Sequence, residues 1–181
     1  MTDAYLPPAG PTRTHIRSMR YVSTERVLQL SIIHWQLIRD NTPDTYAAFL
    51  STSVDSQKKL AIEEMRRRGL FTPEEYPSRS LCFACTHDNN VTSTTACSRC
   101  VVWPQPEDSH SRYSCEREGS PYEAWRMSCV RVLELGRSTP PGNWRAMRDL
   151  MRKHAQEMVT LLEERLHEEM GTQVQVPHHP V

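Results

Sequence analysis

The feature that most constrains this chain is the stretch from 78 to 119, in which hydrophobic periodicity disappears. Cysteine, serine, threonine, asparagine and proline dominate it, whereas helical patterns flank it on both sides. A segment of that length without a periodic pattern is uncommon inside a compact domain unless something other than a hydrophobic core orders it. We therefore expect a metal-ordered insert between helical regions.

Two C-x2-C units lie in this insert, Cys82/Cys85 and Cys97/Cys100. Two intervening residues let the backbone turn tightly, so that both thiolates of a unit converge on one metal ion. Zinc accepts four thiolates in tetrahedral geometry. The spacing therefore predicts one structural zinc, with an iron–sulfur cluster or ordinary thiols as the alternatives.

The identity of the fourth zinc ligand has several alternatives in the sequence. Cys115 follows the two pairs and is an alternative ligand, as are His87 and His110. Cys129 lies four residues after Trp125 on an apolar helical face, where a small thiol packs well, so we expect it in the core.

The cysteine surplus favours a closed structural site, because catalytic zinc needs three protein ligands and an open position. The sequence contains no H-E-x-x-H unit and no glycine-rich phosphate loop. We therefore predict no catalytic residues and no enzymatic activity. Residues 1–10 do not resemble a signal peptide, so we expect the cysteines to stay reduced.

Periodicity and capping signals predict the helices around the insert. The first starts at Ser23 and stops at Asn41, the third runs from about Asp55 to Arg68 with Leu60 on its apolar face, and the last runs from Asn143 to about Met170. Ser120 to Glu123 forms a capping box with proline at the first helical position.

The predicted fold class is mainly α, with N-terminal helices, a zinc-ordered irregular insert and a C-terminal antiparallel helical hairpin with one long helix. A short β-hairpin is one option for the insert. The expected divisions begin with an irregular basic segment at 1–20 and a helical region at 21–77. The zinc-binding insert follows at 78–119, the helical hairpin at 120–171 and a disordered tail at 172–181.

The order of these elements resembles a group of small, mostly uncharacterised, cysteine-rich bacteriophage and prophage proteins. The resemblance rests on the two C-x2-C units, the single Cys115 and the Ser-Pro-Tyr-x-x-Trp sequence at 120–125. It implies a phage origin, a zinc site and, for a phage-encoded chain, the cytoplasm of an infected bacterium. Such proteins commonly have proline directly after the fourth cysteine, whereas here Val101 follows Cys100.

A basic cluster begins the last helix: Arg145, Arg148, Arg152 and Lys153. Basic side chains at the positive end of a helix dipole attract anions, so this cluster is the predicted partner-binding surface. The chain has 22 lysine and arginine residues and 22 aspartate and glutamate residues. Its formal net charge is therefore zero and does not indicate the kind of partner. No apolar run is long enough to span a membrane.

These observations predict a non-enzymatic zinc-binding interaction protein that binds and modulates a host or phage macromolecule, for example as an inhibitor. The alternative is a nucleic-acid-binding zinc protein that uses the basic cluster. A metalloenzyme is the third hypothesis.

Overall fold

The computed structural model describes residues 22–77, 82–84, 100–102, 115, 118–135 and 143–173. Of these residues 77% are helical and none is in a strand, which confirms the mainly α class. The elements in chain order are α1 (Thr24–Asp40), α2 (Tyr46–Leu50), α3 (Val54–Arg67), the 3-10 helix η2 (Pro73–Glu75), α5 (Pro121–Leu135) and α6 (Trp144–Gln173). Most of the predicted insert lies outside the described residues, as do 1–21 and 174–181.

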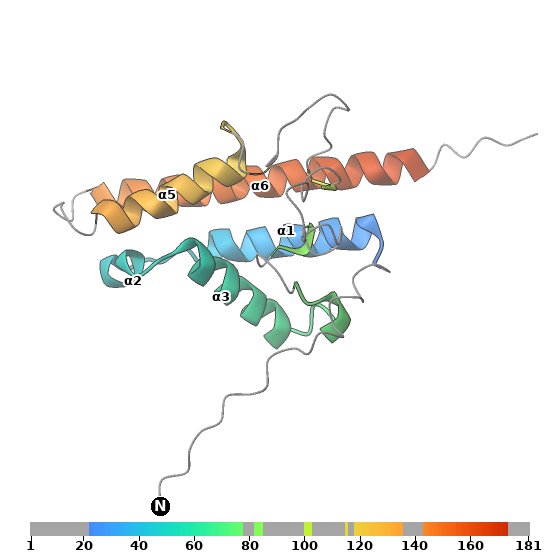
Figure 1. Ribbon diagram of the computed structural model, residues 1–181, viewed down its shortest axis with the longest axis horizontal. Helices are drawn as coiled ribbons and strands as arrows, with labels where there is room; N and C mark the ends of the chain where they lie inside the picture. Colours follow the sequence, from blue (N-terminus) through green and yellow to red (C-terminus); the bar gives the residue numbers. More distant parts are fainter. Residues whose placement is uncertain are drawn as a thin grey trace, which may run out of the picture.

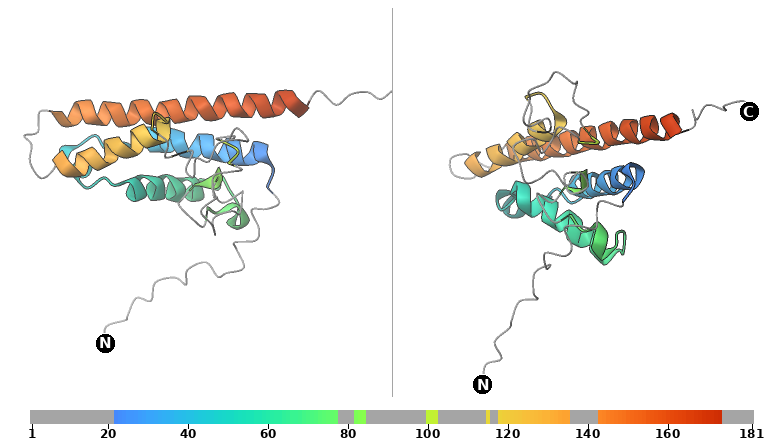
Figure 2. Two further views of the ribbon diagram at one scale, coloured as in Figure 1. Left: turned by 45° about the horizontal axis from the view of Figure 1, so that its top comes forward. Right: turned by 45° about the vertical axis from the view of Figure 1, so that its right-hand side comes forward.

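The helices pack in layers around α1. Helix α1 contacts α6 on one side and α3 on the other, and α5 packs against α6 (Figure 1). Both views of Figure 2 show α1 between α6 and α3. The core fills the space between them, and its largest fully buried side chains are Trp125, Phe49, Phe83, Leu28, Leu30, Ile38, Ile62, Met65, Met151 and Leu162.

The start and end of α1 confirm the sequence prediction. The Ser23 side chain accepts a hydrogen bond from the amide of Arg26 at 3.2 Å, and Asn41 is the C-terminal cap. Such a serine cap stabilises a helix by satisfying an amide that has no partner within the first turn. Helix α3 begins one residue earlier than predicted, after a capping box formed by Ser53 and Ser56.

Two predictions about helix faces and ends are wrong. Leu60 is 52% exposed, and the buried face of α3 contains Ala61, Ile62 and Met65. The last helix does not end near Met170 as predicted, because α6 continues to Gln173. A glycine ends a helix when it adopts the left-handed conformation, as Gly69 does after α3 with φ 65°.

The capping box predicted at the start of α5 forms only in part. The Glu123 amide donates to the Ser120 hydroxyl at 3.0 Å, so the helix starts where the sequence predicts. The Glu123 carboxylate accepts from Arg126 Nε at 2.7 Å, and this ion pair takes the place of the expected bond back to Ser120. The Ser120 hydroxyl itself donates to the carbonyl of Cys115 at 2.6 Å, which fixes that cysteine to the helix start.

Candidate metal centre

Three of the cysteines considered as ligands are described, namely Cys82, Cys100 and Cys115. Cys100 is buried, and the other two are partly buried. Cys85 and Cys97 lie outside the described residues, and so do His87 and His110. Among the described residues, no three cysteine, histidine or acidic side chains form a group that could hold a metal ion. The predicted four-cysteine set therefore stays a prediction.

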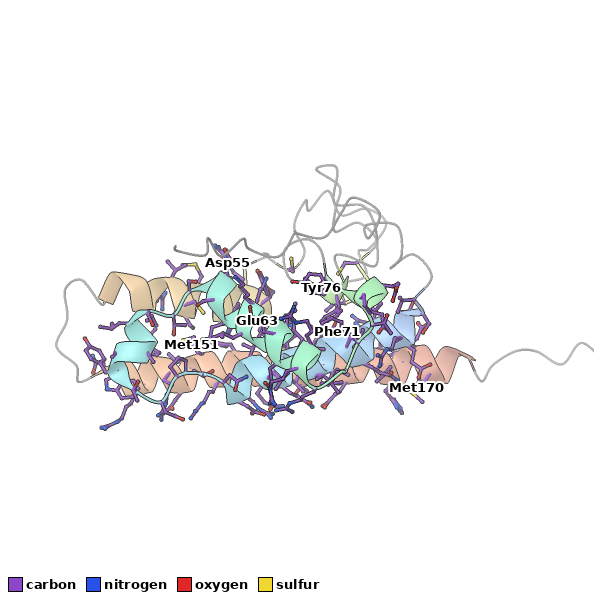
Figure 3. All side chains as sticks on the ribbon, turned by 90° about the horizontal axis from the view of Figure 1, so that it is seen from below. Asp55, Glu63, Phe71, Tyr76, Met151 and Met170 are labelled. Carbon is purple, nitrogen blue, oxygen red and sulfur yellow. The ribbon has the colours of Figure 1, made fainter. Side chains whose placement is uncertain are left out.

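The first C-x2-C unit is anchored in the helical core by its two middle residues. Phe83 and Ala84 are each only 1% exposed. The Phe83 ring contacts His34 of α1 edge-on, with centroids 5.9 Å apart, and Phe71 with centroids 5.7 Å apart. Phe71 and Tyr76, which also contact each other, are labelled beyond α3 in Figure 3. The core thus fixes the backbone that leads from Cys82.

The second C-x2-C unit also reaches the core. Cys100 is buried, and Val102, two residues later, is buried with it in the same hydrophobic cluster. Apolar residues beside the cysteines thus contribute to the helical core from both ends of the paired-cysteine segment. Because burying apolar area is favourable, these contacts hold the segment against the helices without requiring any metal.

A buried lysine faces this region from α3. Lys58 is 5% exposed, and its Nζ atom donates to the hydroxyl of Tyr122 on α5 at 2.9 Å. The same nitrogen lies 4.7 Å from the centroid of the Tyr122 ring. Tyr122 is held in turn by Trp35, whose ring meets it at 90° with centroids 6.0 Å apart.

The surroundings of the Tyr122 phenol raise its pKa. Burial raises the pKa of Tyr122, Lys58 opposes that effect, and negative charge on Cys115 and Cys82 raises it further. The contact that holds this phenol in place is the hydrogen bond that its hydroxyl accepts from Lys58 at 2.9 Å.

The chemistry of this donor set suits zinc. Sulfur ligands bind the metal as thiolates, and a neighbouring cation favours the thiolate form. Lys58 provides that cation beside Tyr122. With the metal bound, the thiolates would hold it as a structural cross-link.

Cys129 is confirmed as a core residue. It is fully buried, and burial raises the pKa of its thiol to about 12, with Lys58 acting in the opposite direction. Helix α5 therefore packs Cys129 into the core.

Comparison of the chain with protein-family models, with curated proteins and with solved structures finds no match. The resemblance to phage proteins therefore rests on the motif residues alone. The functional argument must come from the contacts of the side chains themselves.

Two arginines of the basic cluster of α6 form ion pairs with an acidic residue of the same chain. Arg148 and Arg152 both pair with Asp44, at 3.2 and 2.9 Å, and Arg152 also donates to the carbonyl of Thr42 at 3.3 Å. The guanidinium groups of Arg145 and Arg148 each lie 5.5 Å from the centroid of the Trp144 ring. The acid that pairs with these arginines precedes α2 in the chain.

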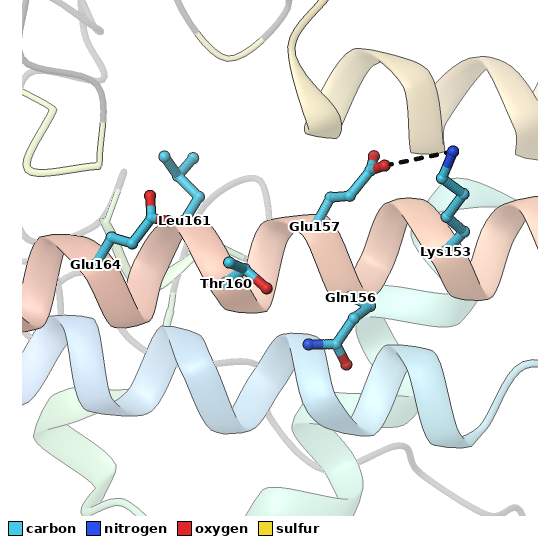
Figure 4. A pocket seen from close by; sticks show the side chains of 6 residues that line it. All are labelled: Lys153, Gln156, Glu157, Thr160, Leu161 and Glu164. Carbon is cyan, nitrogen blue, oxygen red and sulfur yellow. Dashed lines mark ion pairs between the residues drawn. The ribbon is translucent and has the colours of Figure 1, made fainter.

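Lys153, the fourth residue of the basic cluster, lies beside a shallow open hollow on α6 (Figure 4). Its Nζ atom pairs with Glu157 at 3.8 Å. The described residues that line the hollow all belong to α6: Lys153, Gln156, Glu157, Thr160, Leu161 and Glu164. They offer one ion pair on one helix, which is no basis for assigning a catalytic role.

The sequence analysis did not single out the contact between Lys58 and Tyr122, which joins α3 to α5. A signal was present, because Lys58 lies three residues before Ala61 and four before Ile62, in phase with the buried stripe of α3. A lysine in phase with an apolar stripe is a candidate for a buried, paired cation.

Proposed function

We propose that this chain is a non-enzymatic, zinc-binding interaction protein, in which residues 78–119 form a zinc-ordered insert held against a helical body. The observation that supports this proposal most strongly is the burial of Phe83 and Ala84, the middle residues of the first C-x2-C unit. A cysteine pair whose intervening residues belong to the core has a fixed place in the fold. Such placement suits a structural metal, which contributes to folding and needs no open coordination position.

The proposed ligands are Cys82, Cys85, Cys97 and Cys100, with Cys115 as the alternative fourth ligand. The hydrogen bond from the Ser120 hydroxyl to the Cys115 carbonyl, which ties this cysteine to the start of α5, supports keeping it in the set. The metalloenzyme hypothesis ranks last, because it needs a vacant position that a cysteine surplus tends to fill.

Metal analysis tests the zinc proposal directly. Protein purified under reducing conditions should contain about one zinc per chain, because four thiolates saturate a tetrahedral ion. Inductively coupled plasma mass spectrometry against protein concentration measures this ratio. Iron in place of zinc, or reduced and folded protein that takes up no zinc, would contradict the proposal.

The interaction part of the proposal assigns partner binding to the basic cluster in the first turns of α6. Arg145 and Lys153 are exposed at its two ends, and Arg148 and Arg152 lie between them around Asp44. An arginine can contact a carboxylate or phosphate through two hydrogen bonds. The resemblance to phage proteins is the reason to propose a host or phage macromolecule as the partner.

Charge reversal of Arg148 and Arg152 to glutamate should leave the protein folded and abolish partner capture. Exposed ion pairs contribute at most about 1 kcal/mol each, so losing the pairs with Asp44 should lower the free energy of unfolding only modestly. Pull-down from bacterial host lysate with mass spectrometry, and thermal unfolding of the same samples, measure the two effects.

The matched control for that experiment is Asp44→Asn. This variant loses both ion pairs with Asp44 but keeps both arginines and the pair of Arg148 with Asp149, so it should retain the captured partner. Equal capture by the reversal variant and by the wild type would show that the basic cluster is ordinary solvated surface. Loss of capture in Asp44→Asn would instead show that arginine placement, rather than charge, decides binding.

Nucleic-acid binding is the second candidate function, and the two arginines over the Trp144 ring support it. Stacking on an aromatic ring holds guanidinium groups in place for phosphate contacts. A fluorescent duplex DNA fragment gives the discriminating measurement. If this function holds, the logarithm of the affinity falls linearly with the logarithm of the salt concentration.

A further inference from the structure

Helix α6 has an exposed stripe on the side that faces away from the core. Its buried side includes Met151, Ala155 and Leu162, which pack into the space shared with α1 and α5. On the other side, exposed residues follow one another at steps of three and four, the spacing of helices that pair side by side. This exposed stripe consists of Asp149, Lys153, Gln156, Thr160, Glu164, His167 and Gly171.

The charges of the exposed stripe are arranged symmetrically about its middle. Met158, which is buried on the opposite side of α6, marks the midpoint along the helix. Asp149 lies nine residues before this midpoint, and His167 lies nine residues after it. Lys153 lies five residues before the midpoint, and Glu164 lies six residues after it. Each of these groups in the first half thus has a complementary group at nearly the same distance in the second half.

A second copy of the chain complements this stripe when it lies antiparallel. With a twofold axis at the midpoint, Lys153 of each copy faces Glu164 of the other, and Asp149 faces His167. A twofold interface uses the same patch on both copies, so one stripe provides both sides. We propose that the exposed stripe of α6 is a self-association surface through which two copies of the chain pair antiparallel. This inference is independent of the zinc site and of the partner proposed for the basic cluster.

The shallow hollow on α6 lies at the middle of the proposed interface. Gln156, Thr160 and Leu161 line it, with Lys153 and Glu164 at its two ends (Figure 4). Leu161 is three residues past the midpoint, so its copies in the two chains would lie about 9 Å apart along the helix axis. Each Leu161 would therefore lie over the hollow of the other copy and add apolar contact near the twofold axis.

The strength of the proposed dimer is limited by the size of its surface. An interface with one helix from each copy is smaller than the about 1,600 Å² typical of stable complexes. Lys153 can exchange its partner at little cost, because its ion pair with Glu157 is 3.8 Å long and lies at the surface. Added salt screens contacts between exposed charges. We therefore expect a weak dimer that forms as protein concentration rises and dissociates as salt is added.

Sedimentation velocity of the full chain over a range of concentrations tests the inference. Lys153→Glu and Glu164→Lys each place like charges opposite each other twice, so each should raise the dissociation constant about 10-fold. The double variant with both changes restores both ion pairs in the antiparallel arrangement and should dimerise nearly as the wild type does. Lys59→Glu makes the same charge change at an exposed position of α3 and is the matched control, with wild-type dimerisation expected.

The outcomes separate this inference from the proposed function. Glu164 lies outside the basic cluster, so its reversal leaves the charges proposed for a host or phage partner in place. A chain that stays monomeric up to about 1 mM, or a dimer that Glu164→Lys does not weaken, would overturn the inference. A double variant that folds but does not regain dimerisation would refute the antiparallel register. Circular dichroism confirms that each variant keeps its helices, and Glu164→Lys decides the question if Lys153→Glu fails to fold.

Discussion

Replacing Cys82 with serine should abolish stoichiometric zinc binding. A serine hydroxyl stays protonated at neutral pH and cannot replace a thiolate ligand, so the site would be left with three sulfurs. Structural zinc sites bind with about 10–16 kcal/mol, and this energy is also folding energy for the segment that holds the metal. We expect zinc affinity to fall by at least about 100-fold and the insert to lose protection from proteolysis. Metal content after gel filtration and limited proteolysis measure the two effects.

Cys129→Ser is the control for that experiment. Cys129 is fully buried on α5, so a serine there places a hydroxyl in the core and should lower the free energy of unfolding by about 1–3 kcal/mol. The variant should nevertheless contain about one zinc per chain. The reverse pattern, with zinc retained in Cys82→Ser and lost in Cys129→Ser, would show that the ligand assignment is wrong.

The helix starts were predictable because their signals are local. A serine three residues before an amide that needs a partner identifies the N-terminal cap without any tertiary information, as at Ser23 and Ser120. Gly69 ends α3 for an equally local reason, since its φ of 65° is readily adopted by glycine. Mainly helical character followed from the same short-range patterns.

The buried face of α3 could not be predicted by ranking its residues by hydrophobicity. Leucine is more apolar than alanine, yet Leu60 is exposed and Ala61 is buried, on a helix that packs against α1. Packing partners decide which stripe of a helix is buried, and close approach of two helices favours a small residue at the contact. The same rotation buries Lys58, although lysine is a residue type that hydrophobicity alone places at the surface.

The pairing of the basic cluster with Asp44 is long-range and equally invisible to local patterns. Asp44 precedes α2 and is separated from Arg148 by 104 residues. Only the packing of α2 and α1 against α6 brings this acid to the arginines. The sequence identified the residues of the candidate surface, but the fold determines how much of their charge is available to a partner.

Truncating Phe83 to alanine should have the largest effect on stability of any single change at the candidate centre. Phe83 is 1% exposed between His34 and Phe71, and phenylalanine-to-alanine changes in such cores cost about 3–5 kcal/mol. Leu60→Ala, which also removes a large apolar side chain but at an exposed position, should change stability by about 0.5 kcal/mol or less. Urea unfolding of both variants, with zinc removed by a chelator, measures the difference without the contribution of the metal.

The result for Phe83 bears on the candidate centre because the same ring joins the cysteine segment to α1. If Phe83→Ala is strongly destabilising in metal-free protein, the helical core positions Cys82 before zinc binds, and the metal completes a site that is already largely in place. If Phe83→Ala costs no more than Leu60→Ala, the segment does not pack on the core in solution. In that case the core would not position Cys82, and the zinc proposal would rest on cysteine spacing alone.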